Sequence, residues 1–233
     1  MIVRGELGEC TSWQLSGTAP MVLVPVGSTE QHGPHLPLDT DTRIATAVAH
    51  RVAADLDCPT APALGYGASG EHRGFPGTVS IGTTAMAAVL TEYGRSACEW
   101  AGRLVFINGH GGNAEALCDA VTLLRGEGRD AAWAGCSAPG GDAHAGHTET
   151  SLLLHLSPHL VCTGRLAPGN VEPLSELMPR LRRGGVAAVS GSGVLGDPRT
   201  ATAAAGREIL AAMVADCATR VQRWTPGPGG MLI

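Results

Sequence analysis

The sequence predicts an α/β fold with a mainly parallel central sheet and helices on both of its faces. Short apolar runs typical of buried strands alternate with longer apolar-periodic runs typical of helices. This alternation favours βαβ units, which build parallel sheets. Glycine-rich polar segments follow several strand runs, at the positions where α/β proteins carry their functional loops.

Composition narrows the classes of protein that this chain can belong to. The 233 residues are 44% hydrophobic and 16% charged, which suits one globular domain over residues 1–233. Aromatic residues make up only 3%, so the core must consist mostly of Ala, Val and Leu. A net charge of -5 gives no electrostatic footprint for nucleic acid, so no nucleic-acid partner is expected. The basic residues are all arginine, which excludes a catalytic lysine.

Cysteine usage indicates a reducing compartment. Seven cysteines are scattered singly, with no C-x-x-C pair and an odd total. This pattern fits free thiols in the cytoplasm better than a disulfide framework. We see neither a signal peptide nor an apolar run of 18 residues, so no membrane partner is expected.

The first half of the chain contains the first strand–helix unit. Residues 1–20 form a polar segment with a weak signal for one short helix. Residues 21–26 are predicted as a strand and residues 40–56 as a helix. Residues 58–64, interrupted by proline, suit a second short strand. Residues 65–78 contain too much glycine for regular structure, and are either a flexible linker or a loop that approaches a ligand. The polar residues Ser69, Glu71 and His72 within them favour the ligand loop.

The middle of the chain repeats this alternation. Residues 103–108 are the clearest buried strand, and residues 130–135 are another short strand. Helices are predicted over residues 83–102, 113–125 and 148–156.

The last third is less regular. Residues 164–200 are predicted to be rich in loops. The arginines within residues 180–183 could bind an anionic group, although a solvated face fits them better. Residues 201–224 are a long amphipathic helix that ends at the Pro/Gly-rich residues 226–230. The tail beyond it is expected to be frayed or docked on a neighbouring subunit.

Residues 25–43 gather metal-competent side chains in a loop between a strand and a helix. Glu30, His32 and Asp41 make a plausible set of hard and borderline metal ligands, with His35 and Asp39 nearby. The alternative is a polar turn in which Asp39 or Thr40 caps the next helix.

Two further stretches of the same kind also follow strands. Residues 108–113 (Asn-Gly-His-Gly-Gly-Asn) contain His110, and residues 144–151 contain His144 and Glu149. The ends of parallel strands meet at one sheet edge, so the three stretches can converge on two divalent ions. A phosphate loop at 108–113 is a weaker reading because the G-x-G-x-x-G pattern and a Walker lysine are missing.

Four further residues are candidates for substrate binding, and three histidines are not. The Gly-rich loop contributes Ser69 and His72, and the second stretch contributes Gly111 and Gly112, as candidate substrate-binding residues. Three further histidines, in or beside apolar helical stretches, are interpreted as structural: His50, His155 and His159.

These stretches together resemble the motifs of the creatininase family. The motifs are Gly-Ser-Thr-Glu-Gln-His-Gly-Pro-His-Leu-Pro-Leu-Asp-Thr-Asp (27–41), Ser-x-x-His-x-x-Phe-Pro-Gly-Thr (69–78), Asn-Gly-His-Gly-Gly-Asn (108–113), His-Ala-Gly-x-x-Glu-Thr-Ser (144–151) and Gly-Val-Leu-Gly-Asp-Pro (193–198). The resemblance extends from about residue 20 to 225. It implies a three-layer α/β/α sandwich, a metal-dependent amide hydrolase with two divalent metal ions per chain, and a homo-oligomer.

The resemblance also implies roles for single residues. It implies that Glu30, His32, Asp41 and His110 bind metal, with Asp41 bridging the two ions. Zinc, iron or manganese would suit these ligands. His144 matches the family's catalytic histidine, which would stabilise the tetrahedral intermediate and protonate the leaving amine.

Two departures from the family's pattern bear on the site. Creatininase has a glutamate ligand at the position of Gly112, so Glu149 is the natural replacement, either as metal ligand or as catalytic base. Creatininase's Trp-Asp substrate clamp is replaced here by Gly140 and Gly141, which argues against creatinine as the substrate.

Within the family, residues 32–49, 66–72, 139–151 and 182–190 are most similar to the mycofactocin-system branch. That resemblance implies a peptidase that cuts a modified precursor peptide just before its C-terminal Val-Tyr-derived dipeptide unit. The alternatives are a small-molecule amide hydrolase (a formamide deformylase or a cyclic amidohydrolase), a non-catalytic metal-binding scaffold and a nucleotide-binding α/β protein.

Overall fold

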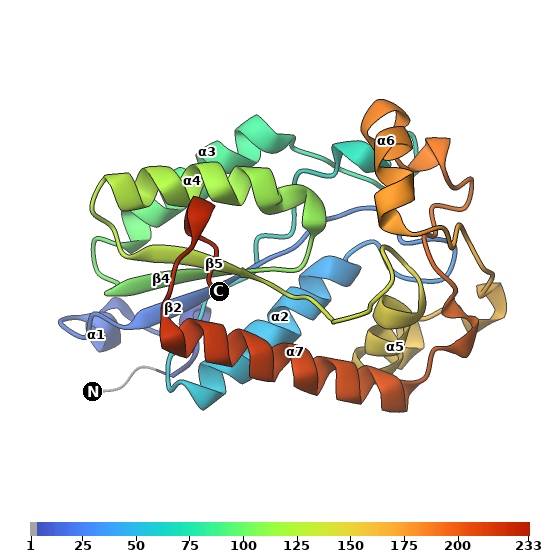
Figure 1. The fold of residues 1–233 in the computed structure, drawn as a ribbon. Helices are drawn as coiled ribbons and strands as arrows, with labels where there is room; N and C mark the ends of the chain where they lie inside the picture. Colours follow the sequence, from blue (N-terminus) through green and yellow to red (C-terminus); the bar gives the residue numbers. More distant parts are fainter. Residues whose placement is uncertain (1–3) are drawn as a thin grey trace.

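The computed structural model describes residues 4–233 and contains a five-stranded, fully parallel sheet (Figure 1). The strand order is β1-β3-β2-β4-β5. Three strands form its centre and one edge: β2 (Met21–Val26), β4 (Arg103–Asn108) and β5 (Ala131–Gly135). The two others have two residues each: β1 (Gly5–Glu6) and β3 (Pro59–Thr60). The predicted α/β fold with a parallel sheet is confirmed.

Helices cover both faces of the sheet, which makes three layers (Figure 1). One face carries α3 (Thr83–Ala97) and α4 (Ala114–Gly126). The other carries α2 (Thr40–Asp55), α5 (His147–Leu156) and α7 (Ala203–Arg223). Alternate residues of one strand face opposite layers, as Leu23 and Val24 do in β2. This explains why the strand runs are apolar throughout.

The three strands that precede the candidate stretches end in register. Val26 of β2 pairs with Asn108 of β4, and Asn108 pairs with Gly135 of β5. The loops that follow them therefore begin at one edge of the sheet, as the sequence predicted.

Two regions differ from the expectation. The segment predicted as loops contains the helix α6 (Leu174–Gly184), despite the internal Pro179. The N-terminal polar segment contains β1 besides the short helix α1 (Ser12–Leu15), and its first three residues lie outside the described part of the chain.

The C-terminal tail is not frayed. It returns to its own sheet, where the Leu232 N–H donates to the carbonyl oxygen of Trp133 (2.8 Å). The Trp133 indole N–H donates to the Gly229 carbonyl oxygen (2.9 Å), and Leu232 is buried. The frayed alternative was therefore wrong, because β5 is an edge strand whose free backbone groups the tail can satisfy. Contact of the tail with a neighbouring subunit stays a prediction.

Within residues 4–233, we find no helix with both the length and the apolar character that crossing a membrane requires.

Candidate active site

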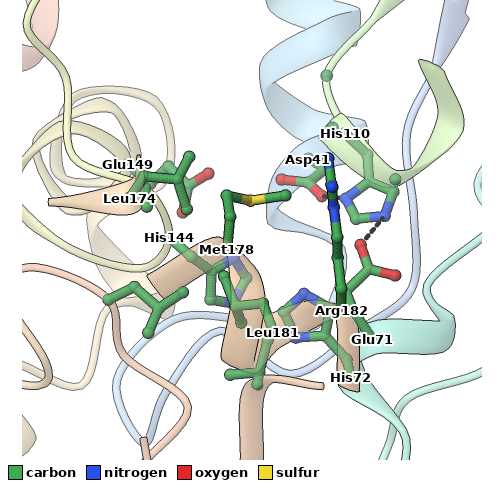
Figure 2. Close-up of a pocket in the computed structure, with 16 residues that line it drawn as sticks. Asp41, Glu71, His72, His110, His144, Glu149, Leu174, Met178, Leu181 and Arg182 are labelled. Atoms are coloured by element: carbon green, nitrogen blue, oxygen red, sulfur yellow. Dashed lines mark ion pairs between the residues drawn. The ribbon is translucent and has the colours of Figure 1, made fainter. Parts of the chain in front are cut away.

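A cavity of about 470 Å³ lies beside the loops that follow the three in-register strands (Figure 2). Acidic and imidazole side chains from four separate segments line one side of it. These are Asp41, Glu71, His72, His110, His144 and Glu149.

The segment between β2 and α2 supplies three buried groups. Glu30 and His32 lie in the loop, and Asp41 lies in the first turn of α2. The His32 Nε2 atom is 3.0 Å from Asp41 Oδ1. The Ser28 hydroxyl donates to Asp41 Oδ2 (2.8 Å), which fixes the orientation of the carboxylate.

The loop after β4 brings His110 to the same carboxylates. His110 Nδ1 is 3.1 Å from Asp41 Oδ2, and His110 Nε2 is 3.2 Å from Glu30 Oε2. Asp41 therefore lies between His32 and His110, with one oxygen near each imidazole. This is the arrangement that a carboxylate needs in order to bridge two ions.

The segment after β5 supplies His144 and Glu149. The Ala145 N–H donates to Glu149 Oε2 (2.6 Å), and that oxygen is 3.8 Å from His32 Nε2. Ala145 is buried and has a φ of 51°, in the left-handed region that non-glycine residues seldom adopt. The side chain of Asp142 accepts backbone N–H bonds from His147 and Thr148, which anchors the start of α5.

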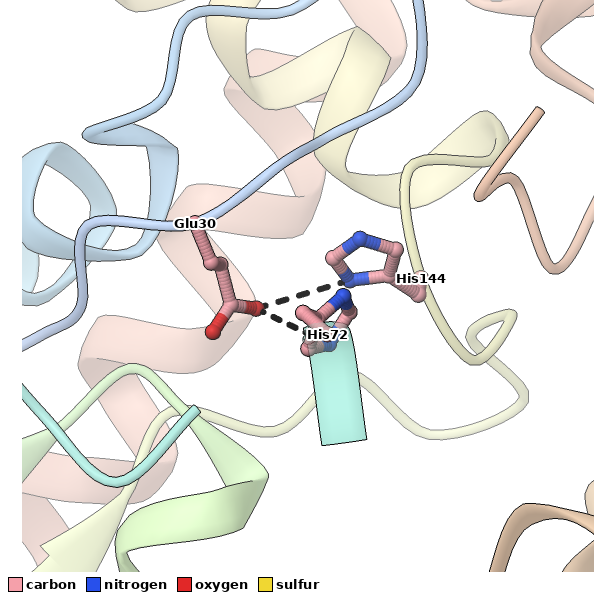
Figure 3. A group of neighbouring side chains, drawn as sticks. All are labelled: Glu30, His72 and His144. Carbon is pink, nitrogen blue, oxygen red and sulfur yellow. Dashed lines mark ion pairs between the residues drawn. The ribbon is translucent and has the colours of Figure 1, made fainter. Parts of the chain in front are cut away.

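Both carboxylate oxygens of Glu30 are buried and accept no hydrogen bond from the described residues. Figure 3 shows two imidazoles beside this carboxylate, with Glu30 Oε1 at 3.3 Å from His72 Nε2 and 3.9 Å from His144 Nδ1. A buried carboxylate without hydrogen bonds is costly, and an ion is one accepted explanation for it. The site therefore fits a bound cation.

Three overlapping groups of these side chains could hold a metal ion, since their ligand atoms lie within 4.8 Å of one another. The groups are Glu30–Asp41–His110, His32–His144–Glu149 and Glu30–His72–His144. The first two share no residue and contain every candidate ligand that the sequence indicated.

The charges of the imidazoles follow from their carboxylate neighbours. Burial alone would lower the pKa of His32, but the charge and hydrogen bond of Asp41 raise it to about 10. Burial is likewise outweighed at His110, where Asp41 and Glu30 raise the pKa to about 9. Burial opposes ionisation of Asp41, yet the two imidazoles hold the pKa of its carboxyl well below its usual range.

Two other carboxyl groups are shifted in the opposite direction. Burial, assisted by the charge of Asp41, raises the pKa of Glu30 to about 8. Burial also raises the pKa of Glu149 to about 7. Such shifts are typical of sites that bind ions or transfer protons.

Gln31 fixes the proton positions on two imidazoles, through its side chain at His72 and through its backbone carbonyl at His144. Its amide nitrogen donates to His72 Nδ1 (2.9 Å) and to the Gly193 carbonyl oxygen (3.2 Å). The proton of His72 is therefore on Nε2, which faces Glu30. His144 Nε2 is 2.8 Å from the Gln31 backbone oxygen, so this nitrogen donates and His144 Nδ1 keeps a free lone pair.

The candidate substrate-binding residues fall into two sets. His72, Gly111 and Gly112 line the cavity, whereas Ser69 is fully buried and lies outside the lining. A Cβ atom at Gly112 would lie 2.4 Å from His110 Nε2 and 2.5 Å from Glu71 Oε1. A glutamate therefore cannot be placed at Gly112 without moving its neighbours.

Two residues of the first stretch lie apart from the three metal-competent groups. The His35 Nε2 atom hydrogen-bonds the Thr150 hydroxyl (2.9 Å), and Asp39 pairs with Arg43 (2.7 Å). Both serve local structure.

Several residues of the site escaped the sequence analysis. Gln31 stands between two candidate ligands, and its neutral side chain gave no signal. Glu71 was noted only as one polar residue in a Gly-rich loop. The helix α6 was not expected at all, although it lines the cavity with Leu174, Met178, Leu181 and Arg182.

Comparison of the sequence with known proteins identifies the family to which this chain belongs. The family model for creatininase (creatinine amidohydrolase) matches residues 10–221. The chain belongs to the creatininase family. The proteins called mycofactocin precursor peptide peptidase from Mycobacterium tuberculosis (strain ATCC 25618 / H37Rv) and Mycobacterium ulcerans are 65% and 64% identical to it. Each alignment covers 99% of this chain and 96% of the relative.

More distant members of the creatininase family are similar over most of the chain. The creatinine amidohydrolase of Pseudomonas putida is 30% identical, over 88% of this chain and 90% of its own. A solved structure of a manganese form of creatininase has a TM-score of 0.77 and 27% identity, over 97% of this chain and all (100%) of its own. A mutant creatininase described as the Zn-Zn type has a TM-score of 0.77 and 28% identity, over 95% of this chain and 98% of its own.

Proposed function

We propose that this chain is a metal-dependent peptidase of mycofactocin biosynthesis. It would hydrolyse the modified precursor peptide just before its C-terminal Val-Tyr-derived dipeptide unit and release that unit. The observation that carries the proposal is the buried, unbonded carboxylate of Glu30 among imidazoles and carboxylates at a cavity. Identity of 65% to proteins named mycofactocin precursor peptide peptidase supports the choice of substrate.

Five residues would hold two divalent ions in this proposal. Glu30 and His110 would hold one, His32 and Glu149 the other, and Asp41 both. Zinc, iron and manganese suit these nitrogen and oxygen ligands, and two solved relatives are described by manganese and by zinc. When bound, the ions would lower the pKa of the attacking water and polarise the scissile carbonyl.

His144 would move the proton in the reaction. Burial, together with the charges of His32 and His72, holds its pKa well below the usual value, so the ring is neutral and Nδ1 can accept a proton. As the attacking water forms its bond to the carbonyl carbon, Nδ1 takes its proton. As the C–N bond breaks, Nδ1 gives that proton to the departing nitrogen. Glu149, with a pKa near 7, would assist as a base when it is not a ligand.

A second candidate is a small-molecule amide hydrolase of the same family, either a formamide deformylase or a cyclic amidohydrolase. The 30% identity to a creatinine amidohydrolase favours it. Gly140 and Gly141, in place of the clamp of creatininase, argue against creatinine itself.

The deciding experiment measures metal content and cleavage of the modified precursor on one sample, before and after chelation. About two ions per chain, with cleavage lost on chelation and restored by metal, would support the proposal. Bound metal with hydrolysis of a formamide, but not of the peptide, would favour the second candidate.

Two variants separate metal binding from proton transfer. Asp41→Ala should lose both metal and turnover, because this carboxylate would contact both ions. His144→Ala should keep the metal and lose about 10²–10⁴-fold in kcat. Full activity of His144→Ala would contradict the role of this imidazole.

The setting of the enzyme is also proposed. We infer a cytoplasmic homo-oligomer, since the cysteines are free thiols and the family resemblance implies assembly. Light scattering on the purified protein would measure the number of subunits.

A further inference from the structure

The cavity has a second side whose chemistry is unlike that of the metal-competent side. The helix α6 places Leu174, Met178 and Leu181 along it, and Arg182 beside them (Figure 2). Spacings of four, three and one residues put these four side chains on one face of the helix. We call these four residues the α6 wall. The catalytic side, defined by Asp41, His110, His144 and Glu149, borders the same cavity.

Within α6, only one side chain is buried and holds the α6 wall against the fold. Leu177 is the buried residue of α6 and points away from solvent into the fold, whereas Leu174 is 47% exposed. Apolar side chains exposed in a cavity gain free energy when a ligand removes them from water. They therefore suit a substrate group that is bulky and apolar.

Arg182 adds a positively charged, planar guanidinium to the otherwise apolar α6 wall. Within residues 4–233 its guanidinium forms no ion pair, unlike Arg180, which pairs with Glu172. No Phe, Tyr or Trp side chain lines the cavity among the described residues, whose only rings there are the imidazoles of the metal-competent side. Within the α6 wall, Arg182 is the side chain on which an aromatic ring of a ligand can stack, since arginine is well suited to cation–π contact.

This inference rests on the proposed function, in which the released unit is the part of the peptide that follows the cleaved bond. The released unit derives from Val and Tyr, so it carries a branched apolar group and an aromatic ring. We propose that the α6 wall is the recognition site for this released unit, with Met178 and Leu181 against the branched group and Arg182 against the ring. The α6 wall would then select peptides by the residues that follow the cleaved bond, while the metal-competent side performs hydrolysis.

The test uses an unmodified dipeptide amide with the side chains from which the released unit derives, and this probe lacks the bond that would be cleaved. Calorimetry on the metal-loaded protein would compare Val-Tyr amide with Ala-Ala amide; the amide end removes any effect of a terminal carboxylate. We expect Val-Tyr amide to bind at least tenfold more tightly. Met178→Ala and Arg182→Ala should each weaken Val-Tyr amide by roughly three- to tenfold and leave Ala-Ala amide unchanged.

The chain offers matched controls for both substitutions. Arg183→Ala makes the same change one residue along the same helix, outside the cavity lining, and should leave both affinities unchanged. Val171→Ala removes an exposed apolar side chain elsewhere and should behave likewise.

The outcomes separate this inference from the proposed function. Equal affinity for the two amides, or equal losses in Arg182→Ala and Arg183→Ala, would overturn the role of the α6 wall. Selective binding that depends on Met178 and Arg182, without cleavage of any peptide, would support the α6 wall and contradict the peptidase assignment. A misfolded variant is recognised by loss of bound metal, and Met178→Leu, which keeps the volume, should then retain the selectivity.

Discussion

The imidazoles of His32 and His110 share one carboxylate partner, and this couples metal binding to protons. Asp41 raises the pKa of both rings above the ordinary value of 6.5. A raised pKa means that the charged ring stabilises the metal-free fold fully below pH 6.5 and that this contribution is lost as the pH rises through about 9 and 10. A metal ligand must be deprotonated, so an ion competes with these protons.

We therefore expect metal loading at pH 7 to release at least two protons per chain, one from each ring. At pH 9.5 the release should be smaller, because His110, with a pKa of about 9, is then largely neutral before the metal arrives. Calorimetric titration in two buffers of different ionisation enthalpy measures the number of protons. Equal release at the two pH values would show that Asp41 does not hold these rings in the charged form.

Gln31 offers a second prediction at this scale. Gln31→Leu removes the amide that fixes the His72 tautomer, so the His72 proton should no longer face Glu30 consistently. We expect about a tenfold lower kcat with unchanged metal content, and altered His72 side-chain nitrogen shifts in ¹⁵N NMR spectra of the metal-free protein.

A substitution at another residue should act through the same side chain. A Cβ atom at Gly193 would lie 1.9 Å from Gln31 Oε1, and the φ of Gly193 is 81°, so Gly193→Ala should reproduce the effect. Gly191 has open space around it, and Gly191→Ala serves as the control. Normal histidine shifts in both Gln31→Leu and Gly193→Ala would show that the tautomer is fixed by other contacts.

At the scale of elements, one glycine sets how closely α5 and α7 pack. A Cβ atom at Gly206 would lie 1.8 Å from the Ser151 carbonyl oxygen, in the helix that carries Glu149. Although alanine normally favours a helix over glycine, here it would push the two helices apart.

Gly206→Ala should lower the free energy of unfolding by about 1–3 kcal/mol, measured by urea denaturation. Gly126→Ala is the matched control, since Gly126 ends α4 with nothing within 4 Å, and its stability should be unchanged or slightly higher. If the two variants had the same stability, the close approach at Gly206 would not limit the packing.

Helices and strands with a clear pattern of apolar residues were predictable from the sequence. Elements that depend on tertiary contacts were not. The strands over residues 21–26 and 103–108 have the predicted bounds, because an apolar run of six residues between polar loops has few alternatives. The helix α6 was missed because Pro179 lies inside it and removes a backbone hydrogen bond. Packing of Leu177 into the fold supports it instead.

At the scale of the whole molecule, the C-terminal tail closes one edge of the sheet. Removal of residues 227–233 would expose the Trp133 backbone and the surface that Leu232 covers. We expect the free energy of unfolding to fall by about 2–4 kcal/mol and the protein to aggregate more readily, because β5 becomes an open edge. Leu232→Ala should produce part of this loss, and Ile233→Ala, at an exposed position, should produce none. Thermal unfolding followed by circular dichroism tests all three.

The sequence predicted which stretches of the chain meet at the site, but it did not predict all of the residues that line the site. Parallel strands that end together bring Asp41, His110 and His144 to one place, so the sequence alone indicated where they meet. Gln31, Glu71 and the α6 wall contribute through contacts between segments far apart in sequence, which no local pattern records. That residues 1–233 form a single domain stays a prediction.

The two sides of the cavity come from different segments of the chain, so substitutions in one segment can alter one side and leave the other unchanged. The metal-competent residues lie in loops that follow strands or in the first turns of α2 and α5, whereas the α6 wall belongs to residues 170–190, whose buried side chains are Leu177, Val186 and Ser190. We therefore expect that this segment can be exchanged between relatives when its buried contacts are kept. A graft of residues 170–190 would transfer a preference for leaving groups and leave the hydrolytic machinery of the recipient in place.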